Sequence, residues 1–386
     1  MTLLIPIYVF AAFASTAWGG CSSIEVRREW REFTTAEKTT WIDAVKCMAH
    51  LPHDDSLYSS VGDFAESFAN ITSNSSYYDD YAYVHSDLNP VIHFTGLFFP
   101  FHRYFVWSYT QALKSRCDYN GVAPYWDWTI DSANVLEAGI WSDDNISGLG
   151  QAVGISDNDF VVGTGGFSSN FTLAYPVSHG LRRNFTLQPY INFASAGDFF
   201  PQLDLDANAT FTPEVIDAAI ANYTGDYKGF QRFIEGFEGP HGSVHEILGG
   251  DLAGYCPEDA SESCFENEPS PTFSANEPLF WMHHAVSTLS SHLTGPPYTL
   301  ISNTIQMVDR VWWKWQNAHP NNTNAFFGGS VQNITTYASY LEYPNGAPPY
   351  LSMKSVLPTD GILAGGTTLA DVWKTEADFL CYTYAS

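Results

Sequence analysis

The 386-residue chain has few basic residues, no Cys-x-x-Cys pair and no long apolar run after its start. Its 16 Lys and Arg stand against 42 Asp and Glu, for a formal net charge of −26. Such a surface repels polyanions and anionic lipids, so we expect neither nucleic acid nor membrane as a partner. No apolar stretch after residue 20 is long enough to span a bilayer. Because no Cys-x-x-Cys pair occurs, the cysteines are predicted to be structural and not metal ligands.

The N-terminus has the layout of a secretory signal peptide. A short apolar run from Leu3 to Phe13 precedes small residues, and cleavage is expected after Ala17 or near Gly20. No Lys or Arg precedes the run, which leaves a buried N-terminal strand or helix as the alternative. The chain also contains nine Asn-x-Ser/Thr sequons, at Asn70, Asn74, Asn145, Asn170, Asn184, Asn208, Asn222, Asn321 and Asn333. We therefore expect residues 1–20 to be removed and the mature chain to be a secreted, extracellular glycoprotein.

The mature chain would keep six cysteines, an even number that suits disulfide bonds in an oxidising compartment. Fifteen pairings are possible, and the sequence alone leaves the connectivity open. A bond between Cys256 and Cys264 would close a short loop. A bond between Cys47 and Cys117 could link two helices, and one between Cys21 and Cys381 could join the termini.

Apolar residues recur at helical spacing in several segments, which predicts a mainly α chain with little β structure. The first such segment covers residues 24–50, with an N-cap at Thr34 and Glu37 in the first turn. Further helices are expected over Pro100–Leu113, His241–Leu248, Glu277–Ala285 and Val311–Gln316. Residues 129–210 are rich in Gly, Ser, Asn and Asp and are predicted to form long loops. No internal repeat or domain boundary is visible, so residues 21–386 are expected to form one domain.

Histidines gather in two clusters. The first contains His85, His93 and His102, and the second contains His241 and His245 followed by the pair His283-His284. Neutral imidazole is a good ligand for copper, zinc, iron and nickel. Two sets of at least three histidines therefore suggest a paired metal site.

The spacing inside each cluster says how the ligands would be presented. An i, i+4 pair such as His241 and His245 projects both rings from one face of a helix, although such pairs also arise by chance. Gly242 follows the first histidine, where a zinc protease would have Glu. In the first cluster, Pro100 is expected to break the chain between His93 and His102. Asn89-Pro90 likewise separates His85 from His93, so we expect these ligands on a loop and a helix end.

The motifs together resemble those of the tyrosinase / polyphenol oxidase family, and most closely its short, secreted fungal members. They are His-x7-His-x8-His-Arg from His85, Pro-Tyr-Trp-Asp-Trp at residues 124–128, His-x3-His from His241, and Pro-x-Phe-Trp-x-His-His from Pro278. The resemblance implies a four-helix bundle that encloses two copper ions in a type-3 centre. It assigns His85, His93 and His102 to the first copper, and His241, His245 and His284 to the second. The remaining histidines, His50, His53, His179, His283, His292 and His319, are then non-ligands.

The resemblance also implies an activity. A copper pair lets dioxygen accept two electrons while an o-diphenol becomes an o-quinone. Glu235 matches a family carboxylate that orients water and accepts a phenolic proton, and Glu238 is its rival for this role. The implied partners are a small phenolic substrate and dioxygen, and a monomer or weak dimer is expected.

Two residues depart from the common pattern of the family, and a third bears on the substrate. Val91 occupies the place of a cysteine that is linked to an imidazole in many members, so no thioether is expected. Gly242 offers no side chain where some phenol hydroxylases have Asn or Asp, which favours oxidation of o-diphenols (catechol oxidase activity). A tyrosinase that also hydroxylates monophenols and a reversible dioxygen carrier remain the alternatives. Glu246 is expected to face the site entrance and to disfavour anionic substrates.

The C-terminal region shows two further family features. Tyr382 and Tyr384 resemble the Tyr-x-Tyr motif that closes the catalytic domain, and they are expected to pair with Arg27 or Arg28. We expect no C-terminal domain that plugs the site. Excising residues 286–306 joins Ala285 to Met307 and restores the family pattern His-His-x2-Val-Asp-Arg. Our hypothesis is that these 21 residues are a translated, unremoved intron, and a genuine loop insertion is the alternative.

Overall fold

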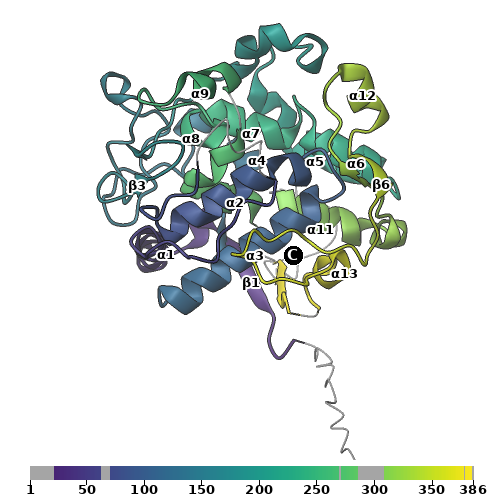
Figure 1. Cartoon of the computed structure of the whole chain (residues 1–386), viewed down its shortest axis with the longest axis horizontal. Coiled ribbons are helices and arrows are strands. Elements are labelled where there is room, and N and C mark those ends of the chain that lie inside the picture. The colour runs from purple at the N-terminus through teal and green to yellow at the C-terminus, as the bar shows by residue number, and fades with distance from the viewer. Residues whose placement is uncertain (1–20, 62–69, 269–270, 286–307, 378, 385–386) are drawn as a thin grey trace, which may run out of the picture.

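The computed structural model describes residues 21–61, 70–268, 271–285, 308–377 and 379–384 (Figure 1). The expected signal peptide and the segment 286–306 lie outside these residues. Within the described part of the chain, no helix combines the length and the apolar character needed to cross a bilayer.

Helices dominate the structure, as predicted (Figure 1). The α-helices are α1 Thr35–Met48, α2 Tyr77–Ile92, α3 Phe98–Arg116, α4 Trp128–Asp131, α5 Pro213–Asn222, α6 Tyr227–Glu235, α7 Pro240–Leu248, α8 Gly250–Ala253, α9 Glu262–Asn267, α10 Pro278–His284, α11 Val308–Ala318, α12 Tyr337–Glu342 and α13 Leu369–Val372. Four of them, α2, α3, α7 and α10, form the bundle around the histidines. α3 packs against α2, α10 and α11, while α7 packs against α6 and α8.

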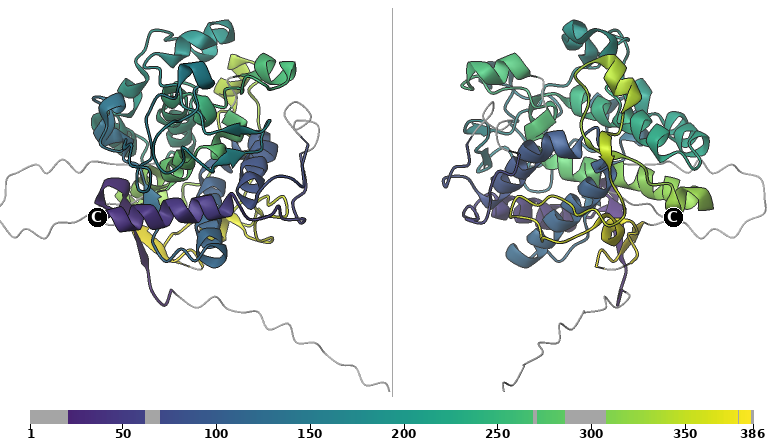
Figure 2. Two further views of the ribbon diagram at one scale, coloured as in Figure 1. Left: turned by 90° about the vertical axis from the view of Figure 1, so that its left-hand side faces the viewer. Right: turned by 45° about the vertical axis from the view of Figure 1, so that its right-hand side comes forward.

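The first helix begins where its sequence predicts. Thr34 is the N-cap of α1: its hydroxyl accepts a hydrogen bond from the Glu37 N–H, and the Glu37 carboxylate accepts one from the Thr34 N–H. Trp41, Val45 and Met48 of this helix are buried. Figure 2 shows α1 lying across one side of the molecule. The burial of these side chains places the apolar face of the helix inward.

The prediction that His85 lies on a loop is wrong. His85 is in the middle of α2, whose residues are almost all buried, and Pro90 lies in the last turn of this helix. Pro90 donates no hydrogen bond to the carbonyl four residues earlier and its ring crowds that carbonyl, yet the helix continues for two more residues. The helix ends at Ile92, and His93 is its C-cap. Pro100 does not break the chain either, because it is the third residue of α3, and the change of direction falls between the two helices at residues 93–97.

Strands are few and short, and the largest sheet joins the two ends of the domain. β1 (Glu25–Glu29), which the helical pattern of residues 24–50 had included, pairs in parallel with β2 (Pro124–Tyr125) and with β7 (Tyr382–Tyr384). The Arg27 guanidinium lies 3.6 Å from the centroid of the Tyr382 ring, which confirms the expected pairing of the Tyr-x-Tyr motif. Two-stranded pairs complete the β structure of the described residues: β3 (Thr172–Leu173) with β4 (His179–Gly180), and β5 (Gly329–Val331) with β6 (Ala347–Tyr350).

Three disulfide bonds have the pairings that the sequence suggested: Cys21–Cys381, Cys47–Cys117 and Cys256–Cys264. The first joins the residues next to β1 and β7, and the second joins the regions at the ends of α1 and α3. The first therefore links the two ends of the domain covalently, and the second links α1 to the end of α3. The region of residues 129–210 consists mostly of loops and short 3₁₀ turns, as expected.

Candidate metal centre

The first histidine group comes from α2, its C-cap and α3. His85 donates from Nδ1 to the Thr272 carbonyl at 2.7 Å, and His102 donates from Nδ1 to the Phe98 carbonyl at 2.7 Å. His93 Nδ1 lies 3.3 Å from the Asn89 carbonyl. Because each Nδ1 carries the proton, the lone pair of each neutral ring is on Nε2. The Nε2 atoms of His85 and His102 are 3.3 Å apart, and the three rings offer nitrogens within 4.8 Å of one another.

The second group comes from α7 and the end of α10. His241 and His245 project from one face of α7, with their Nε2 atoms 3.2 Å apart. His245 donates from Nδ1 to the Leu252 carbonyl at 2.7 Å, which again leaves Nε2 free to bind an ion. His283 and His284 also belong to this group of nitrogens.

His283 and His284 differ in their hydrogen bonds. The Trp128 indole Nε1 donates to His283 Nδ1 at 3.0 Å, so the neutral His283 ring carries its proton on Nε2 and has no lone pair there for an ion. Neither ring nitrogen of His284 has a hydrogen-bond partner among the described residues. The hydrogen bonds thus distinguish His283 from His284, which their spacing in the sequence does not.

The two groups adjoin each other. The His102 and His284 rings stack with centroids 4.5 Å apart, and the His93 and His241 rings are 6.1 Å apart. Both groups therefore share one buried centre between the four helices, where two ions can lie side by side.

Burial keeps these imidazoles neutral. It lowers the pKa of His85 to about 3 and that of His245 to about 4, because the charged form is desolvated. The pKa values of His93, His102, His241, His283 and His284 fall well below 6.5 for the same reason, with repulsion between neighbouring rings as a further cause. Neutral rings with free Nε2 lone pairs are the form that binds a metal ion. The donor set, nitrogen alone, fits copper better than magnesium or calcium, which take oxygen ligands.

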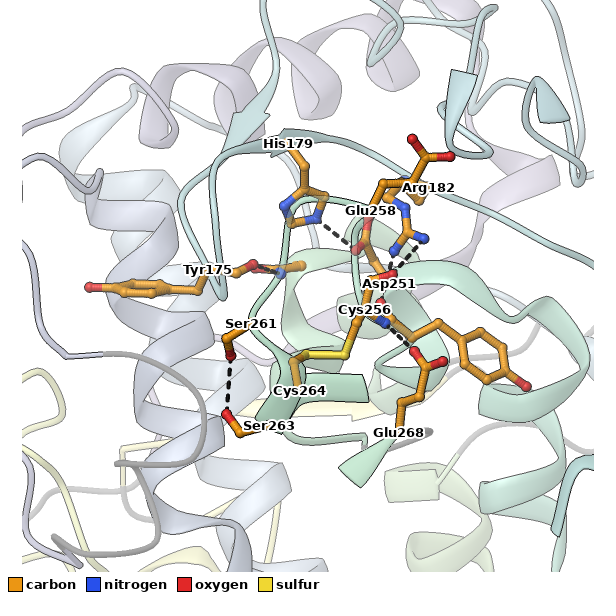
Figure 3. The surroundings of a disulfide bond; sticks show 12 residues. Tyr175, His179, Arg182, Asp251, Cys256, Glu258, Ser261, Ser263, Cys264 and Glu268 are labelled. Atoms are coloured by element: carbon orange, nitrogen blue, oxygen red, sulfur yellow. Dashed lines mark hydrogen bonds and ion pairs between the residues drawn. A yellow bond between two sulfur atoms is a disulfide. The ribbon is translucent and has the colours of Figure 1, made fainter. Parts of the chain in front are cut away.

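Hydrogen bonds and an ion pair outside the centre hold its histidines in place. Arg183 donates two hydrogen bonds of 2.8 Å to Glu277, the N-cap of α10, and both side chains are fully buried. On α8, Asp251 accepts from His179 Nε2 at 2.8 Å and from the Arg182 N–H at 2.7 Å (Figure 3). The carbonyl that orients His245 belongs to the next residue, Leu252. These contacts therefore hold in place α8, whose Leu252 carbonyl orients His245, and the start of α10, which carries His283 and His284.

The side chains of Glu235 and Gln231, both on α6, form hydrogen bonds with the backbone just after His93. Glu235 accepts hydrogen bonds of 2.5 Å from the Phe94 N–H and 2.7 Å from Gln231 Nε2. Gln231 Nε2 also donates to the Thr95 carbonyl at 2.7 Å. Phe94 follows His93 and has a φ of +52°, a conformation that costs energy outside glycine. Burial raises the pKa of Glu235 well above its ordinary value, and the two hydrogen bonds offset this only in part.

A cavity of about 350 Å³ opens over His93, His241 and His245. Its wall includes Glu235 and four phenylalanines: Phe94, Phe193, Phe200 and Phe237. Glu246 lies in this wall, as expected from its place after His245. The rival carboxylate Glu238 lines a different cavity and accepts hydrogen bonds from the main-chain and side-chain nitrogens of Gln202.

The remaining histidines of the described residues lie away from the centre. His53 contacts Asp80, and His179 contacts Asp251. His50 contacts the Lys46 carbonyl, and His319 accepts a hydrogen bond from the Asn321 N–H. His292 lies outside the described residues.

The sequence did not predict the role of Gln231 or the hydrogen bond from Trp128 to His283. Neither spacing nor residue type marks a contact between segments that are distant in the sequence.

The fold and the centre define a helical protein with a paired, histidine-bound metal site. The profile of the common central domain of tyrosinase matches residues 75–287, so the chain belongs to the tyrosinase family. The tyrosinase-like protein phomQ1 of Diaporthe leptostromiformis is 26% identical over 99% of this chain and 83% of its own length. Tyrosinase ustQ of Aspergillus flavus is 26% identical over 96% of this chain and 82% of its own. The structure of a polyphenol oxidase variant from Thermothelomyces thermophila has the same fold, with a TM-score of 0.61, 22% identity and coverage of 94% of this chain and 89% of that one.

Membership of this family makes the chain a copper oxidase with a type-3 dicopper centre. The residues present fit two copper ions, because the two groups supply neutral imidazole nitrogens that converge on one buried centre.

Proposed function

We propose that the protein oxidises o-diphenols to o-quinones and that one dioxygen is reduced to two waters for every two o-diphenols. His85, His93 and His102 would hold the first copper. His241, His245 and His284 would hold the second. The contact between Trp128 and His283 supports this assignment, because it leaves His284 as the member of the pair with both nitrogens free.

The copper pair, when bound, passes two electrons from the o-diphenol to dioxygen. The protein contributes a proton acceptor and an apolar wall for the substrate ring. Glu235 is held at the cavity wall by Gln231 and Phe94, and we propose that it accepts a phenolic proton. The phenylalanines of the wall take the substrate ring and keep bulk water away from it.

The preference for o-diphenols over monophenols depends on Gly242. This residue lines the cavity directly after His241 and offers no group that could help to remove the proton of a monophenol. A Cβ atom at this position would lie 3.2 Å from the Phe237 carbonyl oxygen, so any other residue here requires that carbonyl to shift by a few tenths of an ångström. A monophenol, whose hydroxyl must be deprotonated before hydroxylation, is therefore the poorer substrate.

Dioxygen uptake with a matched pair of substrates tests this proposal. The copper-loaded protein should consume dioxygen with 4-methylcatechol and at least about tenfold more slowly with 4-methylphenol. Equal rates would identify a tyrosinase that hydroxylates monophenols, and no uptake with either would favour a dioxygen carrier. Gly242→Asn should raise the rate with 4-methylphenol relative to 4-methylcatechol, after a small shift of the Phe237 carbonyl.

We also infer that the chain is secreted and glycosylated. Three disulfide bonds suit an oxidising compartment, and the nine sequons suit secretion. Removal of N-glycans from protein secreted by a fungal host should lower its mass, and a mass that does not change would contradict glycosylation.

A further inference from the structure

A groove of about 750 Å³ follows one face of α6. Its wall includes the residues at 229, 232, 233 and 236, which recur at the spacing of a single helix face. Gln231 and Glu235 lie on the opposite face of α6, where they contact the backbone beside His93. Residues from α5 and α12 complete the wall, and Figure 1 shows these two helices on the same side of the molecule as α6. We call this feature the α6 groove. It adjoins the cavity of about 350 Å³ over the histidines, because Gly236 and Phe237 line both.

Aromatic rings are prominent in the wall of the α6 groove. The rings of Tyr223, which follows α5, and Phe233, on α6, have centroids 5.8 Å apart. The rings of Phe199 and Tyr337 have centroids 5.5 Å apart. The remaining aromatic residues of the wall are Phe237 and Tyr340. The electron-rich face of an aromatic ring attracts the polarised C–H groups of a sugar ring, so this wall suits a carbohydrate.

The charges of the α6 groove nearly cancel. Its charged residues are one basic and two acidic side chains: Arg232, Asp226 and Glu238. Arg232 is exposed, and its guanidinium lies 6.0 Å from the centroid of the Tyr340 ring. A wall with little net charge attracts neither a polyanion nor a polycation strongly. Its donors and acceptors suit a neutral ligand that carries many hydroxyl groups, and a carbohydrate is such a ligand.

A sequon lies at one end of the α6 groove. Asn222-Tyr223-Thr224 begins at the last residue of α5, where Asn222 is exposed and its neighbour Tyr223 lines the groove. Val215, seven residues before Asn222, also lines the groove, and residues seven apart share one face of a helix. The amide of Asn208, the other sequon near this groove, already donates to a backbone carbonyl at 2.7 Å. Asn222 is therefore the better placed of the two to carry a group into the groove.

We propose that the α6 groove binds the first sugars of an N-glycan attached to Asn222. The sugar rings pack on Tyr223 and Phe233, and their hydroxyl groups form hydrogen bonds with Asp226 and Arg232. The groove volume lies within the range of sites that bind small molecules, roughly 300–1,000 Å³. A glycan bound in this way connects α5 to α6, the helix that carries Glu235. This inference rests on the proposed secretion and glycosylation and is independent of the proposed oxidation.

Digestion of native protein secreted by a fungal host tests this binding. An endoglycosidase that cuts between the first two sugars should release the glycans of the exposed Asn74 and Asn145 at least about tenfold faster than that of Asn222. After denaturation the rates should be equal, and mass spectrometry of the glycopeptides measures each site. An unmodified Asn222 beside other glycosylated sequons, or equal rates in the native protein, would overturn the inference. The absence of glycans from every sequon would contradict the proposed glycosylation itself, and this inference with it.

A pair of variants tests the part played by the aromatic wall. Phe233→Leu keeps an apolar side chain but removes the ring, so the glycan of Asn222 should be released about tenfold faster than in the wild type. Phe327→Leu is the matched control, because Phe327 is 44% exposed and lies outside the groove. It should leave the release rate unchanged. An unchanged rate in folded Phe233→Leu, or the same acceleration in both variants, would overturn the inference.

Discussion

The Trp128 indole donates a hydrogen bond of 3.0 Å to Nδ1 of His283, and this bond determines which nitrogen of His283 is protonated. A ring that accepts at Nδ1 carries hydrogen at Nε2 and cannot bind copper there. The adjacent His284 has no such restraint. One hydrogen bond thus supplies a physical reason for the copper ligand that the sequence motif implies.

The first prediction follows from this contact. His283→Gln should retain two copper ions per chain, because the amide oxygen can still accept from Trp128. His284→Gln should lose about one copper, because the second ion would keep only two imidazoles. Metal analysis of the two purified variants after copper loading measures the difference. One copper in the His283 variant and two in the His284 variant would reverse the assignment.

The second prediction concerns the two rival carboxylates. Glu235→Gln should lower kcat with 4-methylcatechol by about 10²-fold or more, the range expected for the loss of a proton acceptor. Its new amide N–H₂ would also face Gln231 Nε2, so a small loss of thermal stability is expected. Glu238→Gln is the control, since Glu238 lines another cavity. Comparable rates for the two variants would remove Glu235 from the mechanism.

The third prediction concerns the segment of residues 286–306, which stays a prediction because it lies outside the described residues. The transcript should lack the 21 codons of this segment. A shortened chain that joins Ala285 to Met307 should fold and load two copper ions. Sequencing of cDNA decides the matter, and a transcript that retains these codons would show a genuine insertion.

The fourth prediction concerns pH and stability. Burial alone would lower the pKa of His179, but the charge and hydrogen bond of Asp251 hold it above 6.5. Since the pKa is raised by folding, the contribution of His179 to stability is complete below pH 6.5 and is lost as the pH rises through the folded value. His179→Gln should therefore lower the free energy of unfolding by about 2 kcal/mol at pH 5.5 and by less at pH 9. Denaturant unfolding at both pH values measures this, and a loss that grows with pH would refute it.

The sequence predicted those parts of the molecule that depend on local patterns. The capping box at Thr34 and Glu37 and the i, i+4 pair of α7 are written in short stretches of sequence, and both are present. The prediction failed at α2, where Asn89-Pro90 suggested a break but burial against the rest of the core sustains the helix to Ile92. Local propensity is a weak guide when nearly every side chain of a helix is buried.

Contacts between distant segments could not be predicted. The bond from Trp128 to His283 spans 155 residues, and that from Glu235 to Phe94 spans 141. Neither has a signature in spacing, because each arises when the tertiary fold brings two loops or helix ends together. The family motif supplied the candidate ligands, but only the structure gives the hydrogen bonds that orient them.

The most direct test of the account measures copper content and dioxygen uptake in the same preparations. The copper-loaded wild type should contain two copper ions per chain and consume dioxygen with 4-methylcatechol. His245→Ala should lose the activity and about one copper, because a ligand oriented by Leu252 is missing. His319→Ala, far from the centre, should keep both. Full activity in His245→Ala, or a wild type that binds copper and never oxidises 4-methylcatechol, would contradict a dicopper o-diphenol oxidase.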